Sequence, residues 1–262
     1  MGLWSYEHLI TIPLTFAVMI GLSLLLRLWL LGKDYETRML PLKIIAVIIV
    51  VIEIGKQICS FARGYNLFHI PLHFCSIFLY IIPLFAFYRG KYRESVASVA
   101  TSTMTALFIG MLTIPAVIYG ADRIPTFFTD YLSFHTVFFH NLVIFAFFLT
   151  IALDLHKPTG KKGETLFIAA FGAVFVAVAA SASHILQTNF SNFLNSTVGF
   201  IKEMTDNLAL AIGEIPTKII YTITLALLHI ALMVLTNYIY LLICIGKERL
   251  IKLMKKSKKA ES

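Results

Sequence analysis

The chain has 262 residues, of which 58% are hydrophobic and only 14% are charged, and it carries a net charge of +8. This composition excludes an ordinary soluble protein. Because lipid offers the backbone no hydrogen-bond partners, only helix bundles and closed β-barrels span a membrane. The apolar runs are about 20 residues long, as a spanning helix requires, and they lack the two-residue alternation of barrel strands. The sequence therefore predicts an all-α fold, a polytopic membrane helix bundle.

Seven apolar segments are long enough to be membrane spans. In chain order they comprise residues 9–31, 40–61, 67–88, 96–120, 127–155, 165–186 and 219–245. Basic residues follow the first, third, fifth and seventh spans, whereas the other connections are closer to neutral or acidic. Since cytoplasmic connections carry the excess of Lys and Arg, we expect the N-terminus outside and the C-terminus in the cytoplasm. Residues 1–262 are expected to form a single multi-pass domain, in the cell membrane if the host is a bacterium.

Two segments outside these spans have a distinct composition. Residues 187–218, between the sixth and seventh spans, place Val198, Ile201 and Leu208 at helical spacing, which predicts an amphipathic helix on the outer surface. Residues 246–262 form a basic tail directly after the last span. Because such a tail attracts anionic lipid headgroups, we expect these headgroups, and no nucleic acid, as its partner.

Ionisable and amide side chains gather in the outer halves of the predicted spans, whereas the inner halves are nearly all apolar. A charged group at the centre of a bilayer costs at least about 2.5–3.5 kcal/mol, so these groups are expected to face one another, water or a ligand. Glu53 and Lys56, three residues apart on a helix, are expected to form an ion pair. The sequence predicts one polar chamber. The candidate site residues are Glu53, His69, His73, Cys75, His140 and His184 within it, and Asn189 just beyond the sixth span.

Cys75 lies in the sequence HIPLHFCSIFLY and is one of three scattered cysteines without disulfide or zinc-finger spacing. On a regular helix His69 and His73 share a face, while Cys75 lies roughly 160° around the helix from His73. A thiol in an apolar span needs a base to become a nucleophile. That base is therefore expected on another helix, with His140 the preferred candidate and His184 the second. An inert packing role for the thiol is the alternative.

A metal site is the competing interpretation of the same stretch. In HIPLH, His69 and His73 stand at i and i+4, a spacing that lets one helix offer two ligands. His140, His184 or Glu53 would then complete a zinc site that activates water. The thiol mechanism, in contrast, is expected to need no cofactor.

Several stretches carry a family resemblance. LFHIPLHFCSIFLYIIPLFAF resembles the Pro-Leu-His-(Leu/Phe)-Cys-Ser signature of the YwaF-type membrane proteins, whose eukaryotic relatives are called transmembrane protein 164. TALFIGMLTIPAV, FFHNLVI, LQTNFSNFL and IGEIPTKIIY are similar to further elements of that family, so the resemblance covers most of residues 67–221. It implies a multi-pass enzyme of lipid metabolism, because the eukaryotic relatives look like cysteine-dependent acyltransferases. Carried over residue by residue, it implies Cys75 as nucleophile and His140 as base.

The leading hypothesis is a cysteine-dependent phospholipid acyltransferase or lipid hydrolase, with its site in the outer half of the bilayer and membrane phospholipids as partners. In this hypothesis His73 and Asn189 orient the substrate or stabilise the oxyanion, and His69, Glu53 and His184 support the site. One alternative is a histidine- or metal-dependent membrane hydrolase. Another is a non-enzymatic small-molecule transporter or receptor-like bundle, in which the histidines and the carboxylate form a proton-coupled binding site.

Overall fold

The computed structural model describes residues 6–119 and 123–260, which are mainly helical and contain no β-strand. Among these residues, six helices are long and apolar enough to cross a membrane. They are α1 (Tyr6–Leu30), α3 (Leu40–Ala62), α5 (Arg93–Thr113), α7 (Tyr131–Ala152), α8 (Lys162–Leu186) and α10 (Glu214–Ala260). The shorter helices are α2 (Tyr35–Arg38), α4 (Ile77–Phe87), α6 (Pro115–Tyr119) and α9 (Gly199–Ile212). The predicted all-α membrane helix bundle is confirmed.

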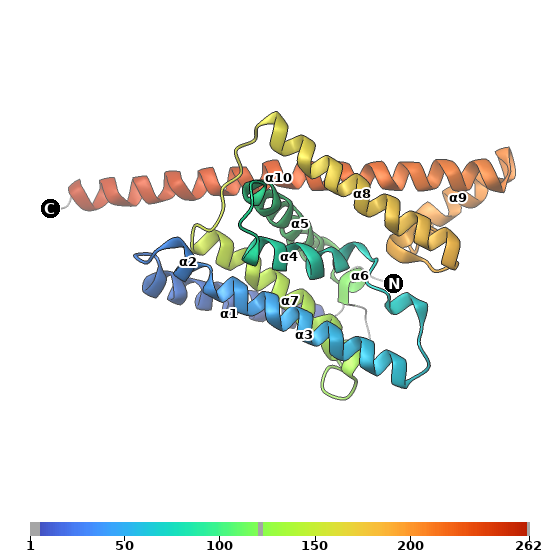
Figure 1. Ribbon diagram of the computed structural model, residues 1–262, viewed down its shortest axis with the longest axis horizontal. Helices are drawn as coiled ribbons and strands as arrows, with labels where there is room; N and C mark the ends of the chain where they lie inside the picture. The colour runs from blue at the N-terminus through green and yellow to red at the C-terminus, as the bar shows by residue number, and fades with distance from the viewer. Residues whose placement is uncertain (1–5, 120–122, 261–262) are drawn as a thin grey trace.

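Helix α5 lies inside the bundle and packs against α4, α7, α8 and α10 (Figure 1). Residues 96–107 of this helix are buried, although many of them are hydroxyl residues. The hydroxyls of Thr101, Ser102, Thr103 and Thr105 donate to carbonyls three or four residues earlier in the helix. Because the polar atoms are satisfied within the helix and the side chains are small, neighbouring helices can approach α5 closely.

Basic side chains gather at the end of the bundle where α7 ends, which we call the basic end. There Arg27, Arg38 and Lys247 donate to the backbone carbonyls of residues 151–153, at the C-terminal end of α7. Arg27 and Lys247 also pair with Asp154, at 3.0 and 2.6 Å. Cations at a helix C-terminus are favoured by the helix dipole. Helix α9 lies at the opposite end of the long axis (Figure 1), and the positive-inside rule predicts that the basic end is cytoplasmic.

The segment before α4 differs from the continuous helix expected over residues 67–88. Two single 3₁₀ turns, joined by extended residues, occupy residues 67–76, and the α-helix begins only after them. Pro71 explains this break, because proline disfavours the α conformation in the residue before it, and Ile70 has a ψ of 130°. The motif that contains the candidate cysteine is therefore a turn at the head of α4 rather than the middle of a helix.

A second proline shortens the fourth predicted span, residues 96–120. Helix α5 ends at Thr113, and Ile114, which precedes Pro115, leaves the helical conformation with φ −136° and ψ 51°. The short helix α6 follows, so the chain bends where the sequence predicted a straight span; residue 120 lies outside the described residues. Because of this bend, α6 packs against both α5 and α7.

Candidate functional site

A cavity of about 340 Å³ lies between α3, the turn segment before α4, α6 and α7, toward the end of α3 that is remote from the basic end. We call it the Cys75 cavity. Five of the seven candidate residues line it, namely Glu53, His69, His73, Cys75 and His140. The other polar or ionisable side chains in its wall are Lys56, Ser76, Tyr119, Arg123, His135 and Thr136.

Close packing of α7 on α3 forms one wall of this cavity. Gly55 has no side chain at the point where the Tyr131 ring crosses α3, and the Tyr131 hydroxyl donates to the carbonyl of Ile52 at 3.0 Å. Asp130 caps α7 by accepting from the backbone N–H of Ser133 at 2.9 Å. The first turns of α7 are thereby held against α3.

Asp130 also connects the segment that follows α3 with the segment that precedes α7. Its carboxylate pairs with Arg63, which follows α3, at 2.9 Å, and with Arg123 at 3.8 Å. The hydrogen bond from Arg63 holds the pKa of Asp130 below its usual range, so the carboxylate stays charged at neutral pH. Arg123 also lines the Cys75 cavity, and its side chain is 36% exposed.

Cys75 occupies the 3₁₀ turn that leads directly into α4, and its side chain is half-buried and free of any disulfide. The first turn of a helix presents backbone N–H groups that favour a negative charge. A thiolate at this position is therefore better placed than one in the middle of a span. Among the described residues, no hydrogen bond joins the thiol to an imidazole.

His140 is buried on α7 and is held in one tautomer. Its Nδ1 lies 2.6 Å from the carbonyl oxygen of Thr136. Since a carbonyl oxygen only accepts, Nδ1 must carry the proton, and the neutral ring keeps an unprotonated Nε2. The ring edge meets Tyr119, with the ring centroids 6.2 Å apart, and Tyr119 itself donates to Asn141 at 2.8 Å. His140 is thus oriented as a proton acceptor.

His73 holds two backbone segments together rather than facing the cavity with a free nitrogen. Its Nε2 donates to the carbonyl of Phe68 at 3.0 Å, and its Nδ1 accepts from the N–H of Ser191 at 3.4 Å. Both ring nitrogens are therefore engaged. The expected role of His73 in binding an oxyanion is not supported by these contacts, and neither is its expected pairing with His69 as metal ligands on one helix face, because that helix face does not exist.

Nδ1 of His69 contacts the Ser60 hydroxyl at 2.6 Å, and the His69 side chain lines the cavity. Among the described residues, no group of three or more His, Cys, Asp or Glu side chains is arranged to hold a metal ion. The donor set around His69 and His73 therefore does not fit the zinc site that the HIPLH spacing suggested.

Glu53 is the centre of a buried charged cluster. Its Oε1 lies 2.7 Å from Lys56 Nζ, and its Oε2 lies 2.9 Å from His135 Nε2. Gln57 donates to the same carboxylate at 2.7 Å and to the carbonyl of His69 at 2.9 Å. The expected ion pair of Glu53 and Lys56 is confirmed, with side chains only 8% and 13% exposed.

The structure does not bring His184 or Asn189 into the Cys75 cavity. His184 Nε2 contacts the Thr222 hydroxyl at 3.1 Å, between α8 and α10. The Asn189 amide donates to Asn195 and accepts from the N–H of Leu194, closing its own loop. His184 was selected by its depth along its helix, and depth does not specify the direction in which a side chain points.

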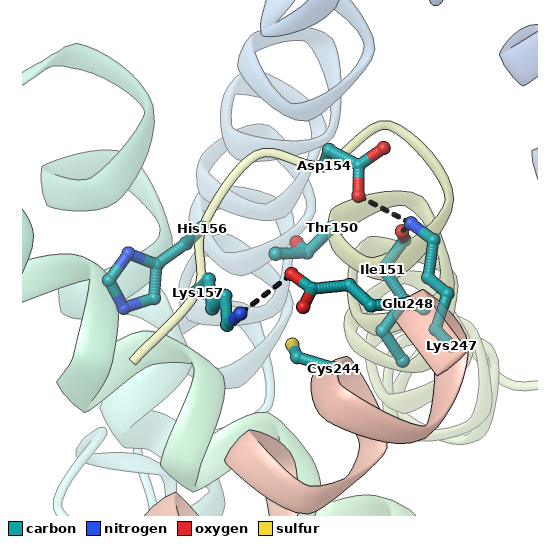
Figure 2. A pocket seen from close by; sticks show the side chains of 8 residues that line it. All are labelled: Thr150, Ile151, Asp154, His156, Lys157, Cys244, Lys247 and Glu248. Carbon is teal, nitrogen blue, oxygen red and sulfur yellow. Dashed lines mark hydrogen bonds and ion pairs between the residues drawn. The ribbon is translucent and has the colours of Figure 1, made fainter. Parts of the chain in front are cut away.

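A second pocket, at the basic end, also combines a cysteine with histidine, lysine and carboxylate side chains (Figure 2). We call it the Cys244 pocket, of about 330 Å³, lined by Thr150, Ile151, Asp154, His156, Lys157, Cys244, Lys247 and Glu248. Two ion pairs of 2.6 Å, Lys157 with Glu248 and Lys247 with Asp154, cross it. His156 contacts Ser98 at 2.9 Å and Glu94 at 3.2 Å, so both its nitrogens are engaged.

The six long apolar helices and the polar cavity among them define an integral multi-pass membrane protein with a buried polar site. A sequence model of the TMEM164 family matches residues 3–237, and the chain belongs to this family. The match spans the whole Cys75 cavity and confirms the resemblance found in the sequence. No curated protein and no solved structure matches the chain.

Proposed function

We propose that this protein is a membrane enzyme that transfers or hydrolyses the acyl chains of phospholipids, with Cys75 as nucleophile and His140 as base. One observation carries the proposal: a thiol at the head of α4 and an imidazole with an unprotonated Nε2 line the same cavity. Thiol and base are the minimum set for nucleophilic acyl transfer. Apo structures commonly show these groups farther apart than in the reacting complex.

A complete cycle follows from these two residues. His140 takes the proton of the Cys75 thiol, and the thiolate attacks the carbonyl carbon of a lipid ester, which forms a C–S bond and moves an electron pair onto the carbonyl oxygen. When that pair returns, the ester C–O bond breaks and His140 gives the proton to the leaving glycerol oxygen. A lysolipid hydroxyl or water, deprotonated by His140, then attacks the thioester. The departing thiolate recovers the proton from His140.

The surroundings of the cavity support a phospholipid as the substrate. The cavity lies among helices that are apolar enough to cross a membrane, so acyl chains are expected to surround the helices that enclose it. Lys56 and the partly exposed Arg123 give its wall two cations against the single carboxylate of Glu53. This balance favours a substrate that carries a phosphate group.

The test supplies the purified protein with a phospholipid that carries a deuterated acyl chain and with a lysolipid acceptor. Mass spectrometry then follows the transfer of the deuterated chain to the acceptor. We expect Cys75→Ala to reduce turnover to background. Cys59→Ala is the matched control, because Cys59 is also a half-buried free thiol but does not line the cavity. Equal turnover by wild type and Cys75→Ala would contradict the proposal.

A proton-coupled transporter is the second candidate, favoured by the charged cluster of Glu53, Lys56 and His135 in the cavity wall. Transport requires no nucleophile, so it should survive Cys75→Ala and fail in Glu53→Gln. Proton uptake by proteoliposomes in the presence of candidate solutes separates the two candidates, since the enzyme proposal expects no flux.

We also propose that the basic tail, residues 246–262, contacts anionic lipid headgroups; residues 261–262 lie outside the described residues. Helix α10 continues past its apolar part into this tail, which places it at the basic end. Truncation after residue 254 should weaken retention by vesicles containing phosphatidylglycerol at low salt, and high salt should remove the difference.

A further inference from the structure

The proposed reaction passes through a tetrahedral oxyanion, and the contacts of the two residues first expected to bind it do not support that role. Both ring nitrogens of His73 are engaged with backbone groups, and Asn189 lies outside the cavity. An oxyanion in a buried site needs preorganised donors, which contribute much of the rate enhancement of acyl transfer. A cationic side chain in the wall of the Cys75 cavity is suited to supply the positive charge.

Lys56 is the best placed cation for this purpose. Its side chain is 13% exposed and lines the same cavity as Cys75. The cavity wall contains two lysine or arginine side chains, Lys56 and Arg123, and Lys56 is the more buried of the two. An ammonium group has three N–H donors, and Glu53 is its only partner among the described residues. Two N–H bonds remain to be directed at a ligand.

Arg123 is a weaker candidate for the same role. Its side chain is 36% exposed, and its guanidinium group lies against Ser133 and Asp130 at 3.4 and 3.8 Å. A solvated cation at the rim stabilises an oxyanion less than a buried one, because water screens its field. The rim position suits recognition of a headgroup instead.

From these contacts we infer that Lys56 binds the oxyanion formed at Cys75 and that Glu53 positions Lys56; the inference rests on the function proposed above. Glu53 is held from two sides, by His135 of α7 and by Gln57, which also bonds the backbone at His69. The ammonium group is therefore fixed relative to α7, which carries His140, and to the turn segment that leads to Cys75.

The cluster also explains why a lysine can be buried here. A buried ammonium without a counter-ion is strongly disfavoured, whereas a pair with additional hydrogen bonds is tolerated. Glu53 supplies the counter-charge, Gln57 donates a hydrogen bond to it, and His135 Nε2 lies 2.9 Å from its other oxygen. The ion pair thus offsets the desolvation of Lys56 in the free protein. The ammonium group does not have to move when negative charge develops on the carbonyl oxygen.

The test measures the rate at which acyl adduct forms on Cys75 after rapid mixing with saturating phospholipid. Loss of one oxyanion donor typically lowers such rates by about 10²–10³-fold, and we expect a fall of this size in Lys56→Met with little change in KM. Lys56→Arg should retain part of the rate, because it keeps the charge. Lys43→Met is the matched control, since Lys43 lies on the same helix and pairs with Glu36 at 2.8 Å at the basic end.

A second variant guards against misfolding. Lys56→Met leaves the Glu53 carboxylate unpaired, whereas the double variant Glu53→Gln with Lys56→Met removes both charges and should keep the fold. It should still acylate slowly, because the cation is missing. Acylation by either Lys56→Met variant within threefold of the wild-type rate would overturn the inference while leaving the proposed function intact. Failure of the wild-type protein to form any adduct or turn over lipid would overturn both.

Discussion

The Cys75 cavity and the Cys244 pocket contain nearly the same kinds of side chain and differ in what those side chains are bonded to. In the Cys244 pocket two ion pairs cross from loop to helix, and His156 has a partner on each nitrogen (Figure 2). In the Cys75 cavity, no other described residue bonds to His140 Nε2 or to two of the three N–H donors of Lys56. Unused hydrogen-bonding capacity, rather than composition, distinguishes a candidate catalytic site from a structural lock.

The largest expected difference between the two regions concerns their histidines. His140→Gln should lower lipid turnover by about 10²–10⁴-fold, the usual contribution of a general base. His156→Gln should leave the rate per folded molecule unchanged, because His156 is engaged with Ser98 and Glu94. Turnover normalised to the folded fraction, measured by size-exclusion chromatography, checks both. A comparable loss in the two variants would remove the distinction.

The two thiols should also differ in reactivity. Cys75 is half-buried and lines a cavity together with His140, whereas Cys244 is 9% exposed and lines a pocket that contains two ion pairs. We expect Cys75 to react about tenfold faster with iodoacetamide, since reactivity follows thiolate character and access. Peptide mass spectrometry over time gives both rates in one sample. Faster labelling of Cys244 would contradict the assignment of the reactive site.

A smaller effect is expected from breaking the lock at the basic end. Asp154 adopts φ +53° and pairs with Arg27 and Lys247, and asparagine tolerates that backbone conformation. Asp154→Asn should therefore lower the unfolding temperature by a few degrees, about the effect of 1 kcal/mol in a protein of this size, without altering turnover per folded molecule. A loss of turnover at unchanged stability would show that the basic end takes part in the reaction.

The same carboxylate predicts the direction of a pH effect on stability. Partial burial by itself raises the pKa of Asp154, but hydrogen bonds from Lys247 and Arg27 outweigh this and hold the pKa below its usual range. Its contribution is therefore present above the unfolded pKa of about 4 and is lost as the pH falls through the lower folded value. Unfolding temperatures between pH 3 and 6 should rise with pH more steeply in wild type than in Asp154→Asn, by roughly the same few degrees.

The smallest effect is expected at an exposed ion-pair cluster near the basic end. Hydrogen bonds from Arg89 and then Lys43 lower the pKa of Glu36 to about 2, yet the group is exposed, so solvent and salt screen the interaction. Glu36→Gln should shift the unfolding temperature by no more than about 1–2 °C, and the shift should vanish in high salt. A large, salt-independent shift would mean that the cluster is shielded by lipid.

Hydropathy and residue depth were sufficient to predict the bundle and most of the site. Depth grouped Glu53, His69, His73, Cys75 and His140 together with His184, and the first five of these line one cavity. The depth of a residue can be estimated from the sequence because a spanning helix has a nearly constant rise per residue. Charged groups at similar depth are expected to cluster, because a charge that faces lipid alone is costly.

The direction of a side chain could not be read in the same way. His184 faces Thr222 and not the cavity, because rotation about a helix axis depends on packing that the sequence does not specify. The helical face assigned to His69 and His73 failed because Pro71 breaks the helix. Arg123, which also lines the cavity, was not predicted, because its position depends on the bend at α6. The sequence offered only one indication of it, a charge directly outside an apolar span.

The central claim is that Cys75 carries the acyl group, and the most direct measurement is peptide mass spectrometry after incubation with mixed phospholipids. We predict an acyl adduct on Cys75 that hydroxylamine removes, that is absent from Cys75→Ala, and that forms slowly in His140→Gln. Either of two results would contradict the claim. One is an adduct on Cys59 or Cys244 in place of Cys75; the other is lipid turnover that forms no adduct and persists in Cys75→Ala.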